Sequence, residues 1–319
     1  MTLLAALLVG AAITAPHRLS LERAHPATAA LIWLAAVCLR ALVALFVVVF
    51  FVFYVPTTAL FGAVTHWCWH TALPLMTSHL GLSGHSVADV ALLAPVLALA
   101  VSLVSVSVGL WRAARSVSAW VRRTSIGPGP QESVIVGEHD IVVAAAGLRR
   151  PRVIVSAGAL TSFDDEELAA SLAHERGHIA HRHRFALVIA EVSRSLARLL
   201  PGTRRAVAEL IFHLERDADR WALVRSHDPI ALASAICKAA QPRGVARGAL
   251  LTLSGGAVTR RVRQLLEDTG APCRRTRLDV LATGMVILVL GLSAALPSAT
   301  LAGIAVAEQS GGTVRHCPD

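Results

Sequence analysis

The sequence predicts an α-helical membrane protein with four transmembrane helices and a cytoplasmic α+β domain inserted between the third and the fourth. Two observations predict this fold class. Hydrophobic residues make up 55% of the 319 residues and charged residues only 16%, a composition typical of membrane proteins. Four runs are apolar enough to cross a bilayer, which takes about 20 residues each, and the segment before the last run has the mixed composition of a soluble domain.

The four apolar runs cover residues 1–15, 27–54, 90–111 and 280–306. The first run could also be a secretory signal, but such a signal carries its positive charge before the apolar segment, whereas Arg18 and Arg23 follow it here. We therefore expect an uncleaved helix with an external N-terminus. Arg40 in the second run is costly in hydrocarbon. It either has a function inside the bundle or lies near the inner interface.

The distribution of arginine predicts the topology. Residues 55–89 contain no Lys or Arg, whereas arginines cluster at both ends of residues 112–279. The positive-inside rule then places the first segment outside and the second in the cytoplasm. The predicted organisation is three helices in residues 1–111, the domain in 112–279, a fourth helix in 280–306 and an outer tail in 307–319. Because the arginines lie beside apolar runs, the net charge of +9 does not indicate direct nucleic-acid binding.

The inserted domain carries signals for a small sheet followed by helices. Short β-branched runs at residues 134–136, 141–146 and 152–156 predict a small antiparallel sheet. Asp164 and Glu167 then have the spacing of a capping box, which predicts the start of a helix that carries Leu168, Leu172 and Ile179. Further helices are expected over about residues 185–200, 205–225 and 230–239.

That first helix contains an HExxH motif formed by His174, Glu175 and His178. Histidines four residues apart leave the same face of a helix and can bind one zinc ion, and the glutamate beside them can take a proton from a water molecule that the metal has acidified. A chance match is the alternative. The capped helix directly after a sheet favours the metal site, so we expect one zinc ion per chain.

A catalytic zinc site needs a third protein ligand. The extended HExxHxxGxxH motif is absent, because His181 stands where it requires glycine and Arg184 where it requires histidine. Glu215 and Asp219 are four residues apart on one face of a later helix, so we predict Glu215 as third ligand and Asp219 as the partner that orients a ligating imidazole. The alternative is an ordinary charged helix face.

Three segments, SFDDEELAASLAHERGHIAHRHR, AAAGLRRPRVIVSAGAL and ERDAD, resemble the BlaR/MecR-type family of membrane metallopeptidases, the enzyme half of β-lactam sensor-transducers. The resemblance covers about residues 1–307 and implies a gluzincin domain, with His174, His178 and Glu215 as zinc ligands and Glu175 as general base. In the sensors of that family a penicillin-binding domain follows the fourth helix. This sequence ends shortly after that helix, so β-lactam acylation is not expected.

Together these features predict a membrane-bound zinc endopeptidase that acts at the cytoplasmic membrane face. Its candidate edge strand for binding an extended substrate contains Val143, Ala144, Ala145 and Ala146. The resemblance implies a cytoplasmic transcriptional repressor as substrate, and self-cleavage as a second reaction. One alternative is an HtpX-type quality-control peptidase, for which two helices before the motif and two after it would be expected. The other is a non-catalytic zinc-binding signalling protein, which would have no need of Glu175.

Two cysteines, Cys68 and Cys317, are expected to face an oxidising compartment outside the membrane. They could form a disulfide bond. Alternatively, they could bind a metal ion together with the histidines of the outer loop.

Overall fold

The computed structural model describes residues 2–19, 21–58, 63, 84–147, 150–225, 228–241, 248–267 and 276–311. Cys68, Cys317 and the histidines of the outer loop lie outside the described residues. The disulfide bond and the outer metal site therefore stay predictions.

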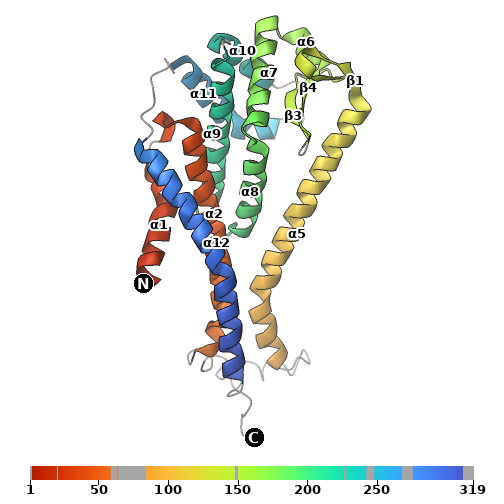
Figure 1. The fold of residues 1–319 in the computed structure, drawn as a ribbon. Coiled ribbons are helices and arrows are strands. Elements are labelled where there is room, and N and C mark those ends of the chain that lie inside the picture. Colours follow the sequence, from red (N-terminus) through yellow and green to blue (C-terminus); the bar gives the residue numbers. More distant parts are fainter. Residues whose placement is uncertain are drawn as a thin grey trace.

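Three long apolar helices form the lower part of the molecule in Figure 1: α2 (Pro26–Phe53), α5 (Gly84–Thr124) and α12 (Thr276–Gly311). Within the described residues, the segments long and apolar enough to cross a membrane are Pro26–Thr57, Leu93–Thr124 and Arg277–Val306. The sequence predicted a fourth, but α1 (Thr2–Arg18) has only 17 residues. That is about 25 Å of helix, less than a bilayer core of about 30 Å, and the N-terminal end of α1 lies above the lower ends of α5 and α12 in Figure 1.

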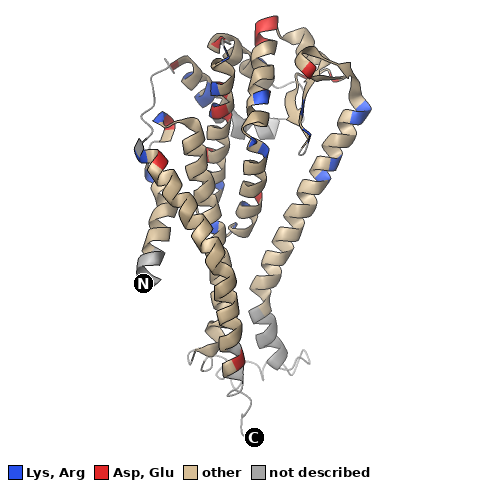
Figure 2. Ribbon diagram, viewed as in Figure 1, with Lys and Arg blue, Asp and Glu red and all other residues tan. Residues whose placement is uncertain are grey.

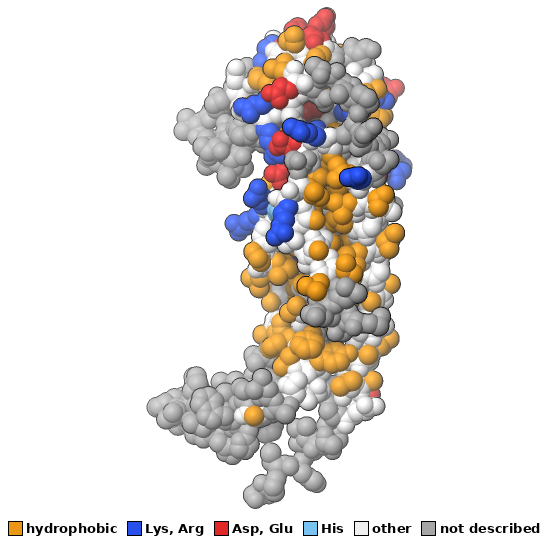
Figure 3. All heavy atoms as spheres, turned by 90° about the vertical axis from the view of Figure 1, so that its left-hand side faces the viewer, with side chains coloured by type: hydrophobic (Ala, Val, Ile, Leu, Met, Phe, Trp, Pro, Cys, Tyr) orange, Lys and Arg blue, Asp and Glu red, His pale blue; other side chains and the backbone are white. Residues whose placement is uncertain are grey.

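The surface of these helices is suited to lipid. Charged residues gather in the upper half of the molecule, and the lower helices carry very few (Figure 2). Apolar side chains cover the middle and lower part of the face in Figure 3. Exposed apolar residues of α5 and α12 include Leu97, Val101, Ile287, Leu290 and Leu301. An exposed apolar surface of this extent is typical of a membrane-embedded segment.

Helix α2 is the centre of the largest core cluster, which joins the long apolar helices α2 and α12 to helices that follow the sheet. Its small residues Ala29 and Ala36 are fully buried, and the cluster continues into Leu210 on α9 and Met285 on α12. Small residues let helix backbones approach closely. Because one continuous core includes residues of α2, α9 and α12, helix α9 is fixed against the two long apolar helices.

Arg40 lies inside this bundle. Its side chain is only 2% exposed. The guanidinium donates to the carbonyl of Ala36 at 3.0 Å and to that of Ile13 at 3.2 Å, and lies 2.8 Å from Nε2 of His17. The side chain of Arg40 thus joins α1 to α2, and a function for it stays a prediction.

Helix α5 continues past residue 111, the predicted end of the third helix, to Thr124. The sheet begins at the next residue. The strands are β1 (Ser125–Pro128), β2 (Val134–Val136), β3 (Val143–Ala146) and β4 (Arg152–Ser156), in the order β1-β2-β4-β3. The outer pairs are antiparallel, but β2 and β4 are parallel. The prediction of an antiparallel sheet is therefore wrong for this pair, because β3 folds back on the far side of β4 instead of beside β2. This order leaves β3 at an edge.

Helices follow the sheet as predicted, with two additions, α6 and α11. Asp164 Oδ1 accepts from the amide of Glu167 at 2.8 Å and Glu167 Oε2 accepts from the amide of Asp164 at 3.0 Å, which confirms the capping box. Neither the short helix α6 nor α11 was predicted from the sequence. The helices are α6 (Ala157–Ser162), α7 (Asp165–Ala180), α8 (His183–Leu196), α9 (Thr203–Leu223), α10 (Pro229–Ala240) and α11 (Gly248–Glu267), and short 3-10 turns lie at Leu21–Arg23, Val55–Thr57 and Pro130–Glu132.

Gly177, inside the HExxH motif, lies at a close approach of α7 and α9. A Cβ atom at this position would lie 3.0 Å from Cβ of Trp221 and 3.1 Å from Cα of Ala218. Contacts that short require a neighbour to shift, so the absence of a side chain at Gly177 allows this helix spacing. The close approach brings the part of α9 that carries Glu215 and Asp219 against the motif.

Candidate metal centre

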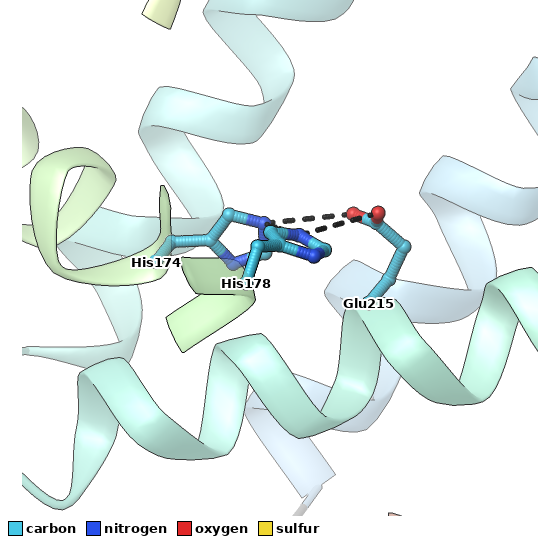
Figure 4. A group of neighbouring side chains, drawn as sticks. All are labelled: His174, His178 and Glu215. Carbon is cyan, nitrogen blue, oxygen red and sulfur yellow. Dashed lines mark hydrogen bonds and ion pairs between the residues drawn. The ribbon is translucent and has the colours of Figure 1, made fainter. Parts of the chain in front are cut away.

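The three predicted ligands converge from α7 and α9 (Figure 4). The Nε2 atoms of His174 and His178 are 3.1 Å apart. Glu215 places Oε2 at 3.5 Å from Nε2 of His174 and Oε1 at 3.5 Å from Nε2 of His178. The structure thus brings together two imidazoles from one helix and one carboxylate from its neighbour.

The spacing of these atoms fits a zinc ion. Ligand atoms about 2.0–2.2 Å from a tetrahedral zinc ion lie about 3.3–3.6 Å from one another. The two imidazole nitrogens are 3.1 Å apart, and each has one of the two carboxylate oxygens of Glu215 at 3.5 Å, a different oxygen in each case. Two histidines and one glutamate are also a donor set typical of catalytic zinc sites, which leave one position open.

Asp219 lies behind the first ligand, as predicted. Its Oδ1 is 2.9 Å from Nδ1 of His174. A carboxylate in this position fixes the imidazole with its proton on Nδ1 and leaves Nε2 for a metal. Arg261 of α11 in turn donates to Asp219 at 2.7 Å and to Oε2 of Glu215 at 2.6 Å. One guanidinium therefore holds the carboxylates of Glu215 and Asp219 in place.

The ionisation of the ligands follows from these contacts. Burial lowers the pKa of His174, but its bonds to Asp219 and Glu215 outweigh burial and raise that pKa to about 9. Burial and the neighbouring His174 lower the pKa of His178 to about 4. For Glu215, burial is outweighed by His174 and Arg261, which lower the pKa to about 2. At neutral pH, metal binding therefore has to displace one proton, that of His174.

Glu175 lies beside the ligands, but its hydrogen bond is to the sheet and not to α9. Its Oε2 accepts from the backbone amide of Ala145 in β3 at 2.7 Å. Burial is the largest effect on its carboxyl group and raises the pKa of Glu175. A buried carboxylate held by a single neutral donor next to a metal site is suited to accepting a proton.

A cleft passes through the site. One cavity of about 660 Å³ lies between α5 and β3 and is lined by Ala114, Val117 and Leu187 among others. A second cavity of about 280 Å³ lies on the side of α10 and α11. His174, Glu175 and Glu215 line both cavities, so the three side chains stand where the two spaces meet.

Strand β3 borders this cleft as an edge strand. Ala144 is paired with Ile154 and Ala146 with Arg152 of β4, whereas the amide of Ala145 points away from β4 to Glu175. Because backbone groups alternate along a strand, Val143 points the same way as Ala145. Of the four predicted docking residues, Val143 and Ala145 therefore present their backbone groups to the cleft.

Sequence reasoning missed three residues next to the ligands: Arg261, His183 and Asp217. Arg261 lies on α11, which the sequence analysis did not predict. His183 places Nδ1 at 2.9 Å from Nδ1 of His178, and its Nε2 is 3.1 Å from Asp217 Oδ2. The only signal for this pair is the run of histidines directly after the motif and the aspartate between Glu215 and Asp219.

The HExxH motif, the third ligand Glu215 and the edge strand β3 together indicate a peptidase site. A comparison with known families agrees. Residues 112–212 match the model of peptidase family M48. Peptidases of family M48 are zinc metallopeptidases. The segment that matches family M48 runs from α5 through the sheet, α7 and α8 into α9; it includes the HExxH motif and ends just before Glu215.

No curated protein and no solved structure matches the chain significantly. The similarity to family M48 therefore supports a metallopeptidase domain, and the site geometry supplies the assignment of individual residues.

Proposed function

We propose that this protein is a membrane-bound zinc endopeptidase that cleaves proteins at the cytoplasmic face of the membrane. One observation carries the proposal: the ligand atoms of His174, His178 and Glu215 converge at zinc spacing next to Glu175, in a cleft bordered by an edge strand. A structural zinc site would be closed by four protein ligands. Among the described residues, three converge here.

His174, His178 and Glu215 would hold the ion. When bound, zinc supplies Lewis-acid chemistry for the attacking water and the scissile carbonyl. Glu175 takes the proton from the attacking water and delivers it to the leaving amine as the peptide bond breaks. The amide of Ala145 fixes the orientation of the Glu175 carboxylate at 2.7 Å. The raised pKa of Glu175, caused first by burial, favours this proton transfer.

The substrate binds in extended form beside β3. Val143 and the carbonyl of Ala145 face the cleft, while the amide of Ala145 is bonded to Glu175. Backbone groups that face away from the sheet are the arrangement for adding a peptide strand to its edge. The smaller cavity next to the site is lined mainly by apolar side chains, including Phe163, Leu232 and Ile236. We expect it to accept an apolar side chain next to the cleaved bond.

The cytoplasmic orientation rests on arginine. Arg112, Arg115, Arg122 and Arg123 lie on the end of α5 that enters the domain, whereas residues 55–89 at its other end contain no Lys or Arg. A reporter fused after Ser125 should be cytoplasmic and one fused after Ser83 external. The reverse result would place the zinc site outside and remove cytoplasmic proteins as substrates.

Substrate identity is proposed from the resemblance to the BlaR/MecR type, which implies a cytoplasmic transcriptional repressor, with self-cleavage in addition. An HtpX-type quality-control peptidase is the alternative. Within the described residues, two candidate spans precede the motif and one follows it, and this order differs from both layouts. The substrate therefore decides between them: a regulatory role requires one soluble protein to be cut at one site, whereas quality control requires many misfolded membrane proteins to be cut.

The test compares the proteomes of cells that contain wild-type protein, Glu175→Gln or Glu166→Gln. Glu166 is an exposed glutamate of the same helix, so its variant is the matched control. New protein N-termini should appear with wild type and Glu166→Gln and be absent with Glu175→Gln. Equal cleavage by all three proteins would contradict the proposed function.

A further inference from the structure

A second group of histidines lies directly behind the candidate metal centre. His183 places its Nδ1 atom 2.9 Å from Nδ1 of His178, and its Nε2 atom 3.1 Å from Oδ2 of Asp217. The same carboxylate oxygen is bonded to Nδ1 of His181. The four side chains form one chain of contacts that begins at a metal ligand and ends at a half-exposed histidine.

Local backbone geometry creates this chain. Between α7 and α8, Arg182 adopts the left-handed conformation at φ 55°, which is uncommon for a residue other than glycine. The turn brings His183, the first residue of α8, back onto the last turn of α7. His183 and Asp217 are 4% and 3% exposed. Buried polar groups of this kind need partners, and each here has one.

The proton positions along the chain follow from the metal site. His178 faces the other ligands with Nε2, so a neutral His178 that binds metal carries its proton on Nδ1. That N–H needs an acceptor, and the atom opposite is Nδ1 of His183. His183 must then carry its own proton on Nε2, where Asp217 accepts it. Every N–H along this path is satisfied with neutral imidazoles and one carboxylate.

A second metal ion is the competing use of these residues. Ligand atoms of His181, His183 and Asp217 lie within 4.8 Å of one another, as those of His174, His178 and Glu215 do. A metal bound to Nε2 of His183 would, however, force the proton of that imidazole onto Nδ1. It would then face the Nδ1 proton of His178 at 2.9 Å. Two N–H groups cannot satisfy each other, so occupation of the second cluster is incompatible with the ligand form of His178.

We propose that His183 and Asp217 are positioning residues for the metal ligand His178: Asp217 fixes the tautomer of His183, and His183 fixes the orientation and tautomer of His178. His174 has the equivalent support directly from Asp219 at 2.9 Å. Both imidazole ligands are thus held by carboxylates of α9, one directly and one through a second imidazole. This inference rests on the proposed metal site.

The test is a titration of the metal-free, detergent-solubilised full-length protein with Co²⁺, followed by absorbance. His183→Leu removes the acceptor for His178, and the affinity should fall about 10 to 100-fold, as for other partners of metal ligands. His183→Gln restores an acceptor for His178 and a donor for Asp217, so its affinity and cobalt spectrum should be close to wild type. His181→Ala is the matched control at the far end of the chain and should change the affinity less than about threefold.

The outcomes separate the two proposals. A wild-type protein that binds no metal contradicts the proposed function itself. A wild-type protein that binds one ion, with unchanged affinity in His183→Leu, overturns the positioning role alone. Two ions per wild-type chain, with one lost in His181→Ala, would show a second metal site instead. If His183→Leu fails to fold, Asp217→Ala replaces it, with an expected loss of about tenfold, and full affinity in that variant overturns the inference.

Discussion

Two clusters of the same residue types, two histidines and one carboxylate each, lie on either side of the last turns of α7. In the first, the Nε2 atoms of His174 and His178 face each other and Glu215 at 3.1 to 3.5 Å. In the second, a single oxygen of Asp217 already bonds both imidazoles. The comparison teaches that residue type and proximity do not define a metal site: ring nitrogens must be left over after the hydrogen bonds are made.

The surroundings differ in the same sense. The first cluster opens into the cleft together with Glu175. The second lies against a cavity of about 370 Å³ lined by apolar residues of α2 and α9, among them Leu34 and Leu214. The first position opens into the cleft, whereas the second adjoins the apolar helix α2. We therefore assign catalysis to one cluster and support to the other.

The largest effect is expected at Glu175. Glu175→Gln should lower peptidase activity by about 10² to 10⁴-fold, because a general base is lost. Zinc should stay bound, since this residue is not a ligand. Peptide cleavage and metal content measured on the same purified sample check both statements. Loss of zinc along with activity would move Glu175 into the ligand set.

The next largest effect, on zinc affinity, distinguishes the ligand Glu215 from the supporting residue Asp219 on α9. Glu215→Ala should weaken zinc binding more than Asp219→Ala, for which about 10 to 100-fold is expected. Competition with a chelator of known affinity measures both variants. Because Arg261 contacts both carboxylates at 2.6 and 2.7 Å, melting temperatures should be recorded as a control. Equal losses in the two variants would mean that Glu215 also acts only as a support.

Metal affinity should increase with pH, by about tenfold per pH unit between pH 6.5 and 9. The pKa of His174 is raised to about 9 by its hydrogen bonds to Asp219 and Glu215, against burial. This raised pKa stabilises the metal-free fold below pH 6.5, and that contribution is lost as the pH rises through about 9. Zinc competes with the proton of His174 for the imidazole. Zinc affinity therefore rises with pH, whereas the stability contributed by the protonated His174 falls. Calorimetric titrations at several pH values test the slope, and a flat profile would contradict it.

The smallest effect is expected at the outer end of the second cluster. His181→Ala should leave zinc stoichiometry and activity within about threefold of wild type, because this side chain is half-exposed and contacts Asp217 rather than a ligand. Kinetics of the purified variant check this directly. A loss as large as that of Asp219→Ala would remove the distinction between the two clusters.

Sequence reasoning located the elements whose signals are local. The capping box at Asp164 and the spacing of His174 and His178 each lie within one helix, and so does the spacing of Glu215 and Asp219. Pairing between distant segments was not predictable in this way. The parallel pairing of β2 with β4 depends on where β3 folds back.

The residues that contact the ligands could not be predicted from the sequence for the same reason. Arg261 lies 46 residues after Glu215 on a helix without a recognisable start signal. The contact between His183 and His178 depends on the left-handed turn at Arg182, which no glycine marks in the sequence. The site could be predicted as far as its ligands, but not as far as the residues that hold them.

Metal content is the most direct test of the central claim that His174, His178 and Glu215 form one zinc site. Purified full-length wild-type protein and the His174→Ala, His178→Ala double variant would be analysed for zinc per chain after identical chelator washes. We predict about one zinc ion per wild-type chain and none in the variant, because its only remaining ligand is a single carboxylate. Full retention of zinc by a folded double variant would contradict the assignment of this site.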